Sequence, residues 1–123
     1  MNNPTQIVTD FCNAAVRRNV EELLGFFSDD AVYHNIPIAP VRGRDAIAAT
    51  LRGFLDPATE CEFEVLSIAA SGRKVLTERI DRFTINGKKI ALPVMGAFEL
   101  DAQGKISAWR DYFDLAQFTK QMS

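Results

Sequence analysis

The dipeptide Asn86-Gly87 is the strongest constraint on the fold, because it lies between two long runs of strand-forming residues. Asn and Gly readily adopt the positive φ angles that a two-residue hairpin turn requires. Val75–Ile85 before the dipeptide and Lys89–Leu100 after it therefore predict two long antiparallel strands. The chain is thus expected to be built around an antiparallel sheet.

The other elements divide the chain into an early helical part and a later strand-rich part. Helical spacing of apolar residues predicts a first helix capped by Asn3, a short second helix capped by Asn19, and a third helix over Ala46–Phe54. The remaining predicted elements are an extended segment over Ala31–Asn35, strands over Glu62–Ala69 and Ile106–Phe113, and a final helix from Asp114. This order predicts an α+β fold, in which N-terminal helices pack on a strongly curved, mainly antiparallel sheet that forms a cone-shaped pocket.

Composition narrows the possible classes of protein. The chain has 123 residues, enough for a single domain over residues 1–123, and 47% of them are hydrophobic. The net charge of −2 gives no reason to expect a nucleic-acid or membrane-surface partner. Cys12 and Cys61 form no CxxC pair and there is one His, so we expect no metal and no cofactor. A polar N-terminus and free thiols favour a cytoplasmic location.

Strand alternation brings charged residues together with large apolar ones. Arg79 and Asp81 share one face of their strand, and Asp111 lies between Trp109 and Phe113 on one face of the last strand. A carboxylate in apolar surroundings is costly unless it is paired. One arginine between two carboxylates can hold both through bidentate hydrogen bonds, and their pKa values are then pushed apart. Such a site can supply one base and one acid.

Tyr33 and Asn35 are two residues apart on a short strand, so both side chains point the same way, while His34 points elsewhere. A phenol and an amide together have the donors and acceptors needed to hold a water molecule. Base, acid and positioned water suit direct hydrolysis of a strained, neutral electrophile. No Ser or Cys nucleophile with a His base is evident, which disfavours covalent acyl chemistry.

Each of these residues also has a simpler structural explanation. The pair Arg79–Asp81 is, by itself, more often an ion pair at the surface or at a sheet edge. Asp111 alone is more often an exposed strand residue or an early cap of the final helix. Tyr33 alone is more often a half-buried core aromatic. Position and alternation therefore do not establish a catalytic site without further support.

Three motifs in order resemble the limonene epoxide hydrolase family. They are the Arg-x-Asp strand at Arg79-Ile80-Asp81, the closing segment Trp109–Leu115, and the Tyr-x-Asn segment Tyr33–Asn35, which is followed by the loop at Gly43–Ala46. The resemblance extends from about Phe26 to Phe118. It implies the cone-shaped fold shared with ketosteroid isomerases and nuclear transport factor proteins. It also implies hydrolysis of an epoxide to a vicinal diol without a covalent intermediate, and a homodimer that pairs through its sheets.

The same resemblance assigns roles to five residues. Asp111 would be the general base that deprotonates water, and Tyr33 and Asn35 would help to hold that water. Asp81 would be the general acid that protonates the epoxide oxygen. Arg79 would bridge and tune the two aspartates. Alternation along the strands does not by itself decide which aspartate is the base.

The expected pocket is mostly apolar. Its predicted substrate-binding residues come from four segments: Phe83, Leu92, Val94, Phe98, Phe113 and Phe118. Some of these side chains are also good candidates for simple core packing. An apolar lining implies a small lipophilic epoxide as the substrate partner.

Two other functions fit the same fold. A ketosteroid isomerase or polyketide cyclase is one, although no acidic residue lies between Ala31 and Arg44, where an isomerase base would be expected by resemblance. A non-catalytic small-molecule-binding dimerisation module is the other. Buried, paired Asp81 and Asp111 would favour an enzyme, and exposed ones would favour the module.

Overall fold

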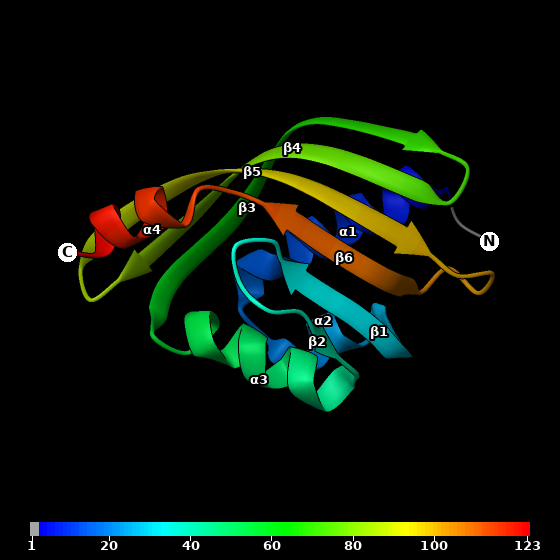
Figure 1. Ribbon diagram of the computed structural model, residues 1–123, viewed down its shortest axis with the longest axis horizontal. Helices are drawn as coiled ribbons and strands as arrows, with labels where there is room; N and C mark the ends of the chain where they lie inside the picture. Colours follow the sequence, from blue (N-terminus) through cyan, green and yellow to red (C-terminus); the bar gives the residue numbers. More distant parts are fainter. Residues whose placement is uncertain (1–2) are drawn as a thin grey trace.

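A computed structural model gives the structure of residues 3–123; Met1 and Asn2, which the predicted single domain includes, lie outside the described residues. Four helices, a 3₁₀ turn and six strands follow one another in the order shown in Figure 1. Their bounds are α1 (Pro4–Ala14), η1 (Ala15–Arg17), α2 (Val20–Leu24), β1 (Phe27–Asn35), β2 (Val41–Arg42), α3 (Arg44–Leu55), β3 (Ala58–Ser71), β4 (Lys74–Ile85), β5 (Lys88–Leu100), β6 (Ile106–Tyr112) and α4 (Leu115–Met122).

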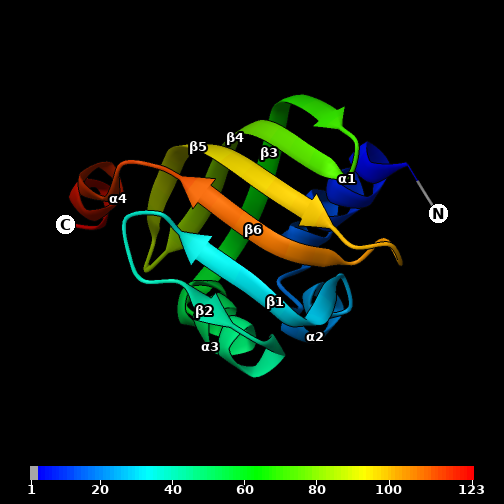
Figure 2. The same ribbon diagram turned by 45° about the vertical axis from the view of Figure 1, so that its right-hand side comes forward.

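The six strands form one sheet in the order β2-β1-β6-β5-β4-β3. Every neighbouring pair is antiparallel except β1 and β6, which run parallel. The sheet is strongly curved and does not close, and α1, α2 and α3 lie on its concave side (Figures 1 and 2). The prediction of an α+β fold with N-terminal helices on a curved, mainly antiparallel sheet is confirmed.

The hairpin at Asn86-Gly87 forms as predicted. Both residues have positive φ angles, 54° and 76°, which is the requirement of the turn. The flanking strands pair continuously from Ile85 opposite Lys88 to Lys74 opposite Glu99. Each strand therefore lies within one residue of the range predicted from its pattern.

The starts of α1, α2 and α4 are also as predicted, because short polar side chains satisfy the free N–H groups of the first turn. The carboxamide of Asn3 accepts from the amide of Thr5 in α1, and Asn19 caps α2 in the same way. Asp114 accepts from two amides at the start of α4. Helix α3 begins two residues before the predicted start, at Arg44.

Three strands differ from the prediction because their limits depend on partners far along the chain. Strand β1 begins at Phe27 rather than Ala31, since Phe27 pairs with Ile106 of β6. Strand β3 extends beyond the predicted range at both ends because it pairs with the whole of β4. Strand β2 was not predicted, because two residues carry no periodic pattern.

The register of the sheet places an aromatic row beside a polar row. Phe98, Trp109 and Tyr33 lie side by side on β5, β6 and β1, and Trp109 is stacked between the other two rings. Phe11 of α1 meets Trp109 edge-on, with ring centroids 5.0 Å apart, which fixes the core against the concave face. The next row contains Thr77, Gly96, Asp111 and Asn35, on β4, β5, β6 and β1. The candidate functional site includes residues of this second row.

Candidate active site

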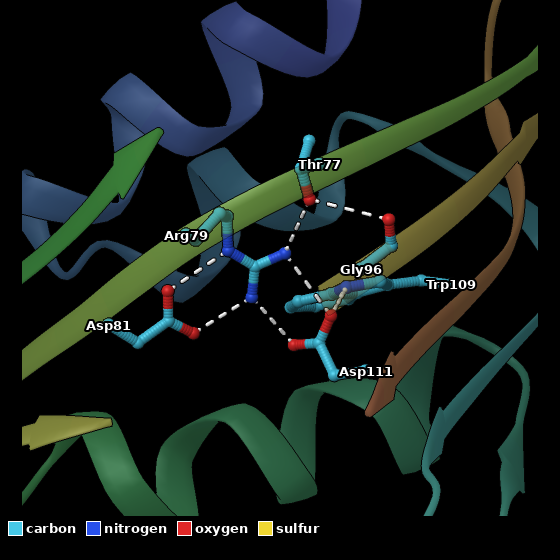
Figure 3. A network of polar contacts seen from close by, with 6 residues as sticks. All are labelled: Thr77, Arg79, Asp81, Gly96, Trp109 and Asp111. Carbon is cyan, nitrogen blue, oxygen red and sulfur yellow. Dashed lines mark hydrogen bonds and ion pairs between the residues drawn. The ribbon is translucent and has the colours of Figure 1, made fainter. Parts of the chain in front are cut away.

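Arg79 of β4 lies at the centre of the site, with only 1% of its surface exposed. Its Nε donates to Oδ1 of Asp81 at 3.0 Å, and its Nη2 donates to Oδ2 of the same carboxylate at 2.8 Å. Both residues point into the cone because they are two apart on one strand. The structure thus brings together the predicted Arg-x-Asp pair as a bidentate, buried ion pair rather than a surface pair (Figure 3).

The same guanidinium also holds Asp111, through the edge formed by its two Nη atoms. Nη1 donates to Oδ1 of Asp111 at 3.2 Å, and Nη2 donates to Oδ2 at 2.8 Å. The indole Nε1 of Trp109 adds a third donor to Oδ1, at 2.7 Å. Asp111 therefore accepts three hydrogen bonds from these groups and Asp81 accepts two (Figure 3).

Thr77 completes the network, and no functional role was predicted for it. Its Oγ1 accepts from Nη1 of Arg79 at 3.2 Å and donates to the carbonyl oxygen of Gly96 at 3.4 Å. A guanidinium has five N–H bonds, and the five contacts to Asp81, Asp111 and Thr77 use all of them. Alternation did place Thr77 on the face of Arg79, but a lone threonine gave no signal of its function.

Burial and charge set the protonation behaviour of the pair. Burial raises the pKa of Asp81 to about 6, against the attraction of the Arg79 guanidinium, which lowers it. Burial would lower the pKa of Arg79, but the carboxylates of Asp111 and Asp81 outweigh it and hold that pKa well above its usual range. Arg79 is therefore a permanent cation, and Asp81 is able to carry a proton near neutral pH.

Tyr33 and Asn35 of β1 both face this network. Asn35 pairs directly with Asp111 in the parallel β1–β6 ladder, and the Tyr33 ring stacks on Trp109 with centroids 4.1 Å apart. Burial, and next the charge of Asp111, raises the pKa of Tyr33 well above its usual range, so the phenol stays protonated. His34 has the opposite orientation along the strand and does not line the cavity.

A cavity of about 250 Å³ opens above the network. The predicted residues that line it are Tyr33, Asn35, Asp81, Phe83, Leu92, Val94, Asp111, Phe113 and Phe118. Sequence reasoning missed six others, which are Ile38, Thr50, Gly53, Phe54, Phe63 and Leu115. Thr50, Gly53 and Phe54 lie on one face of α3, and this helical spacing could have identified them as a group.

Two predicted residues lie outside this lining. Arg79 is beneath the floor of the cavity and acts on it only through the two aspartates. Phe98 was expected to line the pocket but is fully buried in the core, where it stacks on Trp109 with centroids 5.6 Å apart. It shares the inward face with Leu92 and Val94, but its register sets it in the aromatic row behind Gly96.

A larger hollow of about 560 Å³, lined partly by Arg18, Glu60, Glu62 and Arg82, lies elsewhere on the molecule. Its charged side chains are exposed, and the contact between Arg82 and Glu62 is 3.9 Å long. Exposed pairs of this kind contribute little to the stability of the fold. The smaller cavity, with its buried charges, is therefore the candidate active site.

The cysteines offer no alternative nucleophile. Cys12 and Cys61 are free and buried, and burial raises the pKa of each thiol to about 12. Within residues 3–123, no cluster of His, Cys, Asp or Glu is arranged to hold a metal ion. No helix in this part of the chain has the length and apolar character needed to cross a membrane.

Comparisons with known proteins find a matching family and similar proteins. The limonene-1,2-epoxide hydrolase catalytic domain family matches residues 2–123. Epoxide hydrolase EphG of Mycobacterium tuberculosis is 34% identical over 113 residues, which cover 92% of this chain and 74% of that protein. A solved epoxide hydrolase of the same family type from M. tuberculosis has a TM-score of 0.83 at 33% identity, covering 96% of this chain and 87% of its own.

The fold is also found in more distant proteins. A proposed SnoaL-like polyketide cyclase from Shewanella denitrificans has a TM-score of 0.87 at 16% identity. The match covers 97% of this chain and 96% of that one. At this level of identity, the likeness shows a common fold and leaves the chemistry to the residues of the site.

Proposed function

The chain belongs to the limonene-1,2-epoxide hydrolase family and is an epoxide hydrolase, and we propose that it adds water to a small lipophilic epoxide in one step. The product would be a vicinal diol. The observation that carries this proposal is the pair of carboxylates held by one guanidinium at the floor of an apolar cavity. A buried cluster of this kind is expensive in a protein that only binds or dimerises, which argues against a non-catalytic module.

The unequal hydrogen bonding of the two aspartates supports different roles for them. Hydrogen bonds donated to a carboxylate favour its ionised form. Asp111 accepts three and Asp81 accepts two, so Asp111 is the better candidate for the ionised base. The raised pKa of Asp81, about 6, suits a general acid that keeps its proton in an apolar site.

The proposed step balances as a direct displacement. Asp111 takes a proton from a water molecule while the water oxygen bonds to one epoxide carbon. The bond from that carbon to the epoxide oxygen breaks, and the oxygen takes the proton of Asp81. The step leaves Asp111 protonated and Asp81 ionised, so one proton must pass from Asp111 to Asp81 before the next turnover. Arg79 stays charged throughout and stabilises whichever carboxylate is ionised.

Tyr33 and Asn35 would hold the attacking water beside Asp111. The phenol of Tyr33 stays protonated because burial and the charge of Asp111 raise its pKa, so it can donate to the water oxygen. Asn35 is the strand partner of Asp111, and its amide can both donate and accept. A water held by a base and two neutral groups is oriented for attack, which lowers the entropic part of the barrier.

The cavity favours a small, lipophilic substrate. Its volume of about 250 Å³ is below the usual range of pockets that hold drug-sized ligands. Six of its lining residues are aromatic, and its charged lining residues are Asp81 and Asp111. An epoxide bound with its oxygen near Asp81 would place its hydrocarbon part against Phe83, Phe113 and Phe118.

Incubation of the purified protein with a panel of small lipophilic epoxides, without metal or cofactor, tests the proposal by quantifying the diol. Asp111→Asn and Asp81→Asn should each reduce diol formation by at least about 10³-fold, because each removes one proton-transfer partner. Far-ultraviolet circular dichroism would verify that both variants are folded. Diol formation at the wild-type rate in either variant would contradict the two-aspartate mechanism and favour a cyclase.

We also propose that the protein forms a homodimer through the convex face of its sheet. Leu66, Leu76, Met95 and Tyr112 lie on four neighbouring strands, and about half of each side chain is exposed, from 48% to 53%. Exposed apolar groups gathered on one sheet face are typical of an interface. Sedimentation should give the mass of two chains, and Met95→Arg should shift it toward one. A wild-type monomer would contradict this proposal without affecting the hydrolase mechanism.

Two free, buried thiols suit the proposed cytoplasmic location.

A further inference from the structure

Gly96 occupies an unusual position in the middle of β5. Its φ angle lies outside the left-handed region, unlike those of the glycines in the turns, so the backbone does not require glycine there. Glycine inside a strand weakens the strand because it has more freedom to lose and no side chain to pack. A mid-strand glycine of this kind commonly marks a place where another group approaches closely.

The group that approaches is the guanidinium of Arg79. A Cβ atom at position 96 would overlap Nη1 of Arg79 and lie 2.8 Å from both Oδ1 of Asp111 and Oγ1 of Thr77. These neighbours are at most 4% exposed and are hydrogen-bonded to one another, so none can move aside freely. Figure 3 shows Gly96 between Thr77 and Asp111, beside the end of the guanidinium.

The register explains how this space arises. Thr77, Gly96 and Asp111 are directly opposite one another on β4, β5 and β6. Arg79 comes from the next inward position of β4, and its side chain reaches across β5 to contact Asp111 on β6. Only a residue without a side chain at the middle position of this row leaves that path open.

We propose that Gly96 and Thr77 are positioning residues that form the seat of the Arg79 guanidinium and thereby fix Asp111 for proton transfer. Gly96 leaves the space that the guanidinium occupies. Thr77 accepts the fifth N–H of the guanidinium, which is the N–H of Nη1 that neither carboxylate contacts. The Thr77 hydroxyl donates to the carbonyl of Gly96, so its lone pair is turned toward Nη1. The effect on catalysis rests on the proposed function, whereas the effect on the geometry of Asp111 does not.

Trp109 provides a readout of this geometry that needs no substrate. It is the one tryptophan of the chain, and its Nε1 donates to the same oxygen of Asp111 that Nη1 contacts. We therefore expect the wavelength of its fluorescence to report the position and charge of Asp111. A carboxylate that loses a guanidinium contact takes up a proton at a higher pH.

The main experiment compares Gly96→Ala with wild type. We expect the emission maximum of Trp109 to shift and the midpoint of its acid titration to move to higher pH. Diol formation should lose about 100-fold in kcat with KM changed less than threefold, because a small misplacement of a catalytic group is costly. The acid limb of the pH–rate profile should move in the same direction as the fluorescence midpoint.

Ala97→Gly is the matched control, since it alters the same strand by one methyl group on the opposite face. It should keep the fluorescence, the titration and kcat of the wild type. A folded Gly96→Ala protein with wild-type emission, titration and kcat would overturn the proposal. If the wild type forms no diol but the fluorescence of Gly96→Ala shifts as expected, the proposed function is contradicted. The proposal that Gly96 and Thr77 position the Arg79 guanidinium is then still supported.

If Gly96→Ala does not fold, the variants Thr77→Val and Thr77→Ser test whether Arg79 is positioned as proposed. Valine has the shape of threonine but leaves the fifth N–H of Arg79 without an acceptor, whereas serine keeps the hydroxyl. We expect valine to shift the Trp109 titration and to lower kcat, and serine to restore both. If Thr77→Val and Thr77→Ser both behave as wild type, the proposed positioning role of Thr77 is overturned.

Discussion

The floor and the mouth of the cavity are held by different kinds of contact. At the floor and directly beneath it, Thr77, Arg79, Asp81 and Asp111 are between 1% and 4% exposed, and every N–H of the guanidinium has an acceptor. At the mouth, α4 contributes Leu115 and Phe118 to the lining but has no buried residue. Buried, fully paired charges resist displacement, while a surface helix with few contacts opens at little cost.

Side-chain hydrogen bonds connect α4 to β5, and one of them runs from Nζ of Lys88 to the carbonyl oxygen of Met122 at 2.6 Å. Strand β6 ends at Tyr112, so β5 has no strand partner on that side before Met95. The carboxamide of Gln121 takes the place of a strand there, since it accepts from the amide of Ala91 at 2.8 Å and donates to its carbonyl at 2.9 Å. We therefore expect the floor to govern the chemical step and the mouth to govern substrate fit.

Loss of the Arg79 guanidinium beneath the floor should reduce stability and activity more than any change at the mouth. Arg79→Met leaves two carboxylates buried with no cation between them, so we expect a loss of about 3–5 kcal/mol in the free energy of unfolding and no measurable diol formation. Arg82→Met is the control, because Arg82 is about half exposed and pairs with Glu64 at the surface. Urea unfolding of both variants tests this, and a stable Arg79→Met protein would show that the floor is not held by its charges.

The pH dependence of the free energy of unfolding should report the ionisation of Asp81. Its pKa is raised to about 6 in the folded protein, so between about pH 4 and pH 6 the folded state keeps a proton that the unfolded state releases. The stabilisation is complete below about pH 4 and disappears as the pH rises through 6, a change of up to about 3 kcal/mol. Urea unfolding from pH 4 to 7 should show this slope in wild type but not in Asp81→Asn.

The activity should follow the same ionisation, since the proposed acid must hold its proton. We expect kcat/KM of the wild type to fall as the pH rises above about 6. Asp30→Asn, an exposed carboxylate of β1, serves as the control and should leave both profiles unchanged. A flat rate profile between pH 5 and pH 8 would argue that Asp81 does not donate the proton.

A change at the mouth should separate binding from chemistry. Phe118→Ala removes an aromatic wall from α4, and we expect KM to rise about tenfold with kcat changed less than threefold, as for the loss of part of a buried ring. Thr119→Ala, at an exposed neighbouring position of α4, should leave KM unchanged. A fall in kcat as large as that of Gly96→Ala would show that the mouth also positions the reacting groups.

The smallest effect is expected from Gln121→Ala. Its two hydrogen bonds to Ala91 are at the surface, where each contributes about 0.5–1 kcal/mol. We expect faster hydrogen exchange at the Ala91 amide and a change in KM of about twofold, while the Trp109 titration stays as in wild type. Gln117→Ala on the same helix is the control. Unchanged exchange at Ala91 would mean that other contacts hold α4.

Local patterns were enough to predict the caps of α1 and α2, the start of α4, the hairpin and the faces of the strands. Asn3, Asn19 and Asp114 cap helices because a short polar side chain satisfies free N–H groups within its own turn. Alternation placed Arg79 with Asp81, and the motifs in order indicated that Asp111 belongs with them. These features depend on residues close in the chain, or on residue types that a family resemblance carries over.

The sequence by itself determined a curved antiparallel sheet with helices on one side, and the charged residues that face inward. Only the tertiary structure decided that Asp111 receives the third hydrogen bond, that Phe98 lies in the core rather than the pocket, and that Gly96 leaves space for Arg79. The physical reason is that strand register joins residues far apart in the chain. Thr77, Gly96 and Asp111 meet only after three strands have aligned, and no local pattern specifies that alignment.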